Sequence, residues 1–167
     1  MINKKVQDAI NDQIKHELYS AYYYLSMSAY CGGKNLPGFA NWMHLQYQEE
    51  TQHALRLFRF LLDRGGKVEL QAIEAPPKDF KSPLSAFESV LSHEQKVTSL
   101  IHKLYELALK EGDYPTQVEM QWFITEQVEE EKTAGDVVEQ IKLAGDNNTA
   151  LLMIDRELGA RGAGEVA

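Results

Sequence analysis

The segment that decides the fold spans residues 36–60 and reads LPGFANWMHLQYQEETQHALRLFRF. Alternating steps of three and four residues through it select one mostly apolar face, which is typical of a helix packed inside a bundle. Near its middle this face is interrupted by Gln46, Glu50 and His53. The segment therefore predicts a core helix that buries polar side chains halfway along its length. The whole face consists of Leu36, Phe39, Met43, Gln46, Glu50, His53, Leu57 and Phe60.

Helix-breaking residues divide the chain around this segment into four long helices and a short one. The predicted helices span about 3–31, 36–64, 82–111, 113–145 and 148–158, with Gly32-Gly33 expected to end the first. The links within the first and second helix pairs are short, which predicts antiparallel hairpins. The link at 67–81 is long and contains Pro76-Pro77, so it can cross the length of a bundle. We therefore expect an all-α, single-domain fold over residues 1–167: a four-helix bundle (about 3–145) with one long crossover, a short C-terminal fifth helix and a loose tail over 159–167.

The other three core faces are also apolar with polar interruptions. They carry Glu17 on the first helix, Glu94 on the third, and Gln127 and Glu130 on the fourth. All lie near the middle of their helices, so we expect them to meet Glu50 and His53 at one depth. Burying several carboxylates together costs several kcal/mol per ion unless positive charge compensates them, and the faces offer no Lys or Arg at this level.

Bound dications supply the missing charge. Carboxylates with one imidazole suit iron or manganese, and zinc also occupies such sites. Two metals about 3.5–4 Å apart and bridged by a shared carboxylate fit four Glu and one His. Glu50 and His53 form the Glu-x-x-His pattern of di-metal carboxylate bundles.

Two further features surround this predicted centre. Glu49, Glu126 and Glu129 flank the core positions on the second and fourth helices, and we expect them to form an additional outer metal site. Tyr24 lies on the first core face above Glu17, which makes it a candidate hydrogen-bonding or redox neighbour of the metals.

The overall charge excludes other classes of function. The 167 residues contain 17 Lys and Arg against 25 Asp and Glu, for a formal net charge of −8. This balance disfavours nucleic-acid binding, which needs a basic face, and favours cationic ligands. Cys31 is the single cysteine, so neither a disulfide framework nor a Cys-based metal module is expected. Without a long apolar run, we expect no membrane segment and a cytoplasmic protein.

The motifs resemble those of prokaryotic non-haem ferritins over nearly the full length. The resemblance rests on Glu17, Glu50-Thr51-Gln52-His53, Glu94 and the 126–130 stretch Glu-Gln-Val-Glu-Glu, together with the crossover and the short fifth helix. It implies that Glu17, Glu50 and His53 hold one iron of a ferroxidase centre. Glu50, Glu94 and Glu130 would hold the second iron, with Gln127 close by. Glu49, Glu126 and Glu129, with Glu130, would correspond to a third iron site, and Tyr24 and Trp122 to aromatic residues beside the centre.

The resemblance also separates this chain from related families. Bacterioferritins carry a second Glu-x-x-His where this chain has Gln127-x-x-Glu130, and a haem-ligating Met where it has Thr51. Haem is therefore not expected. The family assembles into hollow shells of 24 subunits, so we expect a homo-oligomer of that kind without nucleic-acid or membrane partners. From the residues alone, the apolar fifth helix predicts a partner surface.

The function that follows is iron storage. We expect the protein to oxidise Fe(II) at the buried centre with dioxygen or peroxide, and to deposit Fe(III) mineral inside the shell. One alternative is a di-iron oxidase acting on an organic substrate, although the core faces leave no evident room for one. A metal-free helical scaffold is the other.

Overall fold

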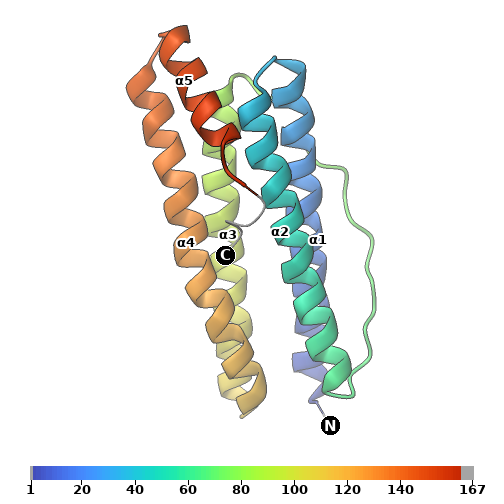
Figure 1. Cartoon of the computed structure of the whole chain (residues 1–167). Coiled ribbons are helices and arrows are strands. Elements are labelled where there is room, and N and C mark those ends of the chain that lie inside the picture. The colour runs from blue at the N-terminus through green and yellow to red at the C-terminus, as the bar shows by residue number, and fades with distance from the viewer. Residues whose placement is uncertain (1, 163–167) are drawn as a thin grey trace.

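The computed structural model describes residues 2–162, and they form five α-helices without a strand (Figure 1). The helices α1 to α4 build an elongated four-helix bundle, and α5 lies across one of its ends. These elements confirm the expected all-α bundle with one crossover and a short fifth helix. Their bounds are α1 Lys4–Gly33, α2 Pro37–Asp63, α3 Pro83–Lys110, α4 Tyr114–Ala144 and α5 Asn148–Gly159.

Local capping explains where the helices begin. The side chains of Asn3, Ser82 and Asp113 each accept a hydrogen bond from a backbone N–H in the first turn of the following helix. α1 runs two residues beyond its predicted end and includes Gly32-Gly33. Glycine lowers helix stability without forbidding the conformation, and the chain turns only at Asn35, whose φ is 58°.

The connections pair the helices as expected. Tight turns join α1 to α2 and α3 to α4, and each pair packs as an antiparallel hairpin (Figure 1). The intervening crossover, drawn in green, extends along the outside of the bundle and returns the chain to the end where α3 begins. Among the described residues no helix is long and apolar enough to cross a membrane.

The core is split into two apolar clusters by a polar layer. On α1 the clusters are separated between Ile14 and Tyr24, and on α2 between Met43 and Leu57. The corresponding gaps on α3 and α4 lie at 91–96 and 124–133. Each gap is filled by buried polar side chains, which places the polar layer at one depth across all four helices.

α5 is fastened to the start of α2. The buried carboxylate of Asp155 accepts a 2.9 Å hydrogen bond from the backbone N–H of Phe39. Gly38 allows this close approach, because a Cβ there would lie 1.5 Å from the Asp155 backbone oxygen.

The C-terminal tail differs from the prediction that it begins at residue 159. Gly159 is the last residue of α5, and the side chain of Arg161 contacts α2. Residues 163–167 lie outside the described part of the chain.

Candidate metal centre

Two ligand groups share Glu50 at the centre of the polar layer. Glu50 and His53 of α2 face Glu17 of α1 to form the first inner group, and all three side chains are buried. Glu50 also faces Glu94 of α3 and Glu130 of α4 to form the second inner group. Within each group the candidate ligand atoms lie within 4.8 Å of one another. Glu50 therefore occupies the position of a bridging carboxylate.

Neighbouring side chains hold the carboxylates of the inner groups. Gln13 donates a 2.7 Å hydrogen bond to Glu17 Oε1, and Gln46 donates a 2.8 Å hydrogen bond to Glu130 Oε2. These contacts fix rotamers without supplying charge, as partners of metal ligands commonly do.

Glu94 is held from two sides. The Tyr24 hydroxyl donates a 2.5 Å hydrogen bond to Glu94 Oε1, and the Gln127 amide donates to Glu94 Oε2 at 3.2 Å. Tyr24 and Gln127, both expected near the centre, thus contact one of its carboxylates. Gln127 presents its amide nitrogen to Glu94 and so positions a candidate metal ligand.

Two polar atoms in the centre stand out from this network. Among the described residues, only Glu50 Oε2 and His53 Nε2 are buried side-chain polar atoms without a hydrogen-bond partner. Buried polar atoms are almost always paired, since leaving one unpaired costs about 1–3 kcal/mol. Both atoms belong to the best metal-ligating residue types at the site, so a cation is the partner that their chemistry indicates.

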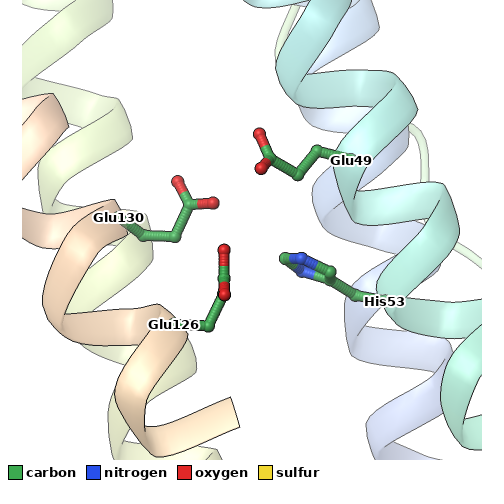
Figure 2. Close-up of side chains that lie close together, drawn as sticks. All are labelled: Glu49, His53, Glu126 and Glu130. Atoms are coloured by element: carbon green, nitrogen blue, oxygen red, sulfur yellow. The ribbon is translucent and has the colours of Figure 1, made fainter. Parts of the chain in front are cut away.

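An outer ligand group lies beside the inner two, between α2 and α4. Figure 2 shows Glu49 and His53 of α2 facing Glu126 and Glu130 of α4, and all four are buried. His53 and Glu130 also belong to the inner groups, so the three groups are continuous.

The outer group differs from the sequence prediction in one member. Glu129 is exposed and belongs to none of the three groups, and His53 takes a place in this group instead. Glu126 and Glu130 are four residues apart and share a helix face. Glu129 precedes Glu130 by one residue and is turned about 100° away from it.

Burial dominates the electrostatics of the centre. Loss of hydration raises the pKa of Glu50 and of Glu130 well above the usual range, and neighbouring carboxylates add to both effects. Loss of hydration also raises the pKa of Glu94, to about 7, although the hydrogen bonds from Tyr24 and Gln127 oppose the rise. Burial also raises the pKa of Glu49 and Glu126 in the outer group. The metal-free centre therefore holds protons that an incoming cation must displace.

One functional contact was missed by the sequence prediction. The guanidinium of Arg161, which follows α5, donates to Gln46 Oε1 at 2.5 Å and to Glu49 Oε2 at 3.3 Å. The core faces of the four long helices offer no such cation, so a counter-charge reaches the outer group from the C-terminal segment. Residue 161 falls in the expected tail, and nothing in the sequence pattern predicted that it would return to the centre.

Aromatic residues line the centre on the side of α4. The His53 ring packs edge-on against Trp122 with ring centroids 5.3 Å apart. The Arg56 guanidinium lies 4.0 Å above the Trp122 ring and pairs with Glu119. Trp122 thus has a cation on one side and a candidate metal ligand close by.

Comparisons with known proteins relate the chain to one family over nearly its full length. Residues 7–144 match the model of the ferritin-like domain family. The chain is 39% identical over 161 residues to the bacterial non-heme ferritin of Staphylococcus aureus, covering 96% of this chain and 97% of that protein. It is 42% identical to the bacterial non-heme ferritin of Bacteroides fragilis, covering 96% and 100%.

A solved structure is similar over the same length. The open-pore ferritin of the archaeon Archaeoglobus fulgidus superposes with a TM-score of 0.96 at 49% sequence identity, covering 97% of this chain and 100% of that one.

Proposed function

Since the chain belongs to the ferritin family, as a prokaryotic non-haem member, we propose that its two inner ligand groups are the ferroxidase centre. The protein stores iron and oxidises Fe(II), which is the activity of its family. The observation that carries the site assignment is the pair of buried atoms without a hydrogen-bond partner, Glu50 Oε2 and His53 Nε2, at the junction of all three groups.

Each inner group receives one Fe(II) substrate ion. Glu17, Glu50 and His53 bind the first, and Glu50, Glu94 and Glu130 bind the second. Glu50 is shared, so it holds the two ions within the short separation of about 3.5–4 Å that two-metal chemistry uses. Gln127 and Tyr24 orient Glu94 through their hydrogen bonds.

Proton release accompanies iron entry. The carboxyls whose pKa burial has raised lose their protons when a dication replaces the proton as the neutralising charge. Each of the two Fe(II) ions then gives up one electron, and dioxygen accepts both electrons with two protons to become hydrogen peroxide, or peroxide accepts them to become water. Hard carboxylate ligands favour Fe(III) over Fe(II), which assists the oxidation.

The outer group binds a third ion that passes through or supplies the inner pair. This third site is supported by the buried set Glu49, His53, Glu126 and Glu130, which shares two residues with the inner groups.

We expect Glu126→Gln to reduce the number of Fe(II) ions bound per chain in an anaerobic titration from three to two. The initial rate of Fe(II) oxidation should stay within about twofold, because Glu126 belongs to neither inner group.

Glu129→Gln is the matched control for that experiment. Glu129 also lies on α4 but is exposed and outside the groups, so its replacement should leave three ions bound. Three ions in both variants would contradict the outer site, and a lower count in Glu129→Gln alone would reinstate Glu129 as the ligand.

As a ferritin, the chain assembles with copies of itself into a multi-subunit shell around the stored iron. We place the number of subunits at 24, supported by the near-complete coverage of ferritin relatives and by α5, which adds apolar surface beyond the bundle. Haem is not part of the proposal, because Thr51 stands where haem-binding relatives carry Met. The charge of −8 supports iron ions, and neither nucleic acid nor membrane, as the ligands that reach the protein.

A further inference from the structure

Arg161 holds two of the four carboxylate and imidazole side chains of the outer group. It contacts Glu49 directly, through Nη2 and Oε2 at 3.3 Å. It reaches Glu130 indirectly, because Gln46 accepts from Arg161 and donates to Glu130. One guanidinium thus contacts an outer ligand from α2 and, through one amide, an outer ligand from α4.

The fold holds Arg161 in this place. The docking of α5 through Asp155 and Phe39 directs the following residues along α2, as the red segment in Figure 1 shows. Asn41 donates to the backbone carbonyl of Arg161 at 3.4 Å, and the guanidinium lies 5.7 Å from the centroid of the Trp42 ring. Together with the side-chain hydrogen bonds to Gln46 and Glu49, these contacts hold Arg161, whose side chain is only 18% exposed.

The charge at this place matters for any cation that binds the outer group. Arg161 brings the positive charge of a guanidinium, a pure hydrogen-bond donor, to this position. A dication that takes Glu49 as a ligand meets both the repulsion of Arg161 and the cost of breaking its hydrogen bond to Glu49. The two inner groups have no such competitor, since Arg161 reaches them only through Gln46.

We propose that Arg161 is a built-in competing cation of the outer group, which lowers its affinity for divalent metal and makes it the last of the three to fill. Metal binding there displaces the guanidinium from Glu49. The inference rests on the proposed outer site and adds a determinant of its affinity that lies outside the metal ligands.

The test is a calorimetric titration of the assembled protein with Zn(II), which binds carboxylate and imidazole sites and is not oxidised. We expect the wild type to show two tighter ions and one weaker ion per chain. Arg161→Ala should tighten the weakest ion about tenfold, because a hydrogen bond to a charged group no longer has to break, and should leave the other two unchanged. Arg161→Lys keeps the charge with a single donor group and should fall between the two proteins.

Arg156→Ala is the matched control, since Arg156 is an exposed cation on α5, and it should titrate like the wild type. A purely structural role for Arg161 predicts a lower melting temperature with no change in the weakest affinity, and that result would overturn the proposal.

Glu126→Gln distinguishes failure of the outer site from failure of the competitor role of Arg161. If it removes the weakest ion while Arg161→Ala does not tighten it, the outer site stands and the competitor role fails. If Glu126→Gln leaves three ions bound, both fail.

Discussion

Glu50→Ala is expected to slow the fast phase of Fe(II) oxidation by about 100-fold, with the shell still assembled. Glu50 belongs to both inner groups, so its removal takes a ligand from each ion and leaves nothing to hold the two together. Losing only a supporting partner of a metal ligand costs about 10–100-fold, and losing a shared ligand should reach the upper end of that range. Stopped-flow absorbance of Fe(III) formation under dioxygen measures the effect.

Glu49→Ala is the matched control for this prediction. Glu49 is the adjacent residue on α2, is equally buried, and belongs to the outer group alone. Its first-turnover rate should remain close to that of the wild type, with a difference that grows only over later turnovers. Comparable initial rates in Glu50→Ala and wild type would remove Glu50 from the ferroxidase centre.

The metal-free protein is expected to lose stability as the pH rises from about 4.5 to about 7. In the folded chain the pKa of Glu94 is about 7, against an ordinary value of 4.5. A carboxyl with a raised folded pKa contributes its full stability below the unfolded pKa and loses it as the pH passes the folded pKa. For Glu94 alone the loss is on the order of 3 kcal/mol, and Glu50 and Glu130 shift in the same direction.

Thermal unfolding of chelator-treated protein at several pH values measures this loss. Glu94→Gln cannot ionise, so it should show a clearly flatter dependence of melting temperature on pH than the wild type. Glu106→Gln, an exposed position on the same helix, should keep the wild-type slope. Adding Zn(II) at pH 8 should restore the stability of the wild type, because the dication replaces the lost protons. Equal slopes in wild type and Glu94→Gln would contradict the electrostatic account.

The helices and their central polar layer were predictable because both depend on local rules. Caps, prolines and glycines mark the helix ends, and the step of three and four residues identifies the core faces. Positions near the middle of a long helix meet at one depth whichever way the helix runs. That geometry brought Glu17, Glu50 and Glu94 together without knowledge of the helix order.

The remaining features depend on orientation and on contacts between distant segments. Glu129 was grouped with Glu126 because both lie near Glu130 in sequence, although the four-residue step from Glu126 to Glu130 favours Glu126, and the rotation of α4 exposes Glu129. Arg161 could not be placed at all, since it follows the last helix and reaches the centre only because Asp155 and Gly38 dock α5 on α2. Contacts of this kind have no signature in hydrophobic periodicity.

Anomalous X-ray diffraction from crystals soaked with Fe(II) in the absence of oxygen tests the central claim most directly. We expect two strong iron peaks per chain inside the bundle, one bonded to Glu17 and His53, the other to Glu94 and Glu130, with Glu50 between them. Iron found only on exposed carboxylates, with no peak within bonding distance of Glu50 Oε2 and His53 Nε2, would contradict it.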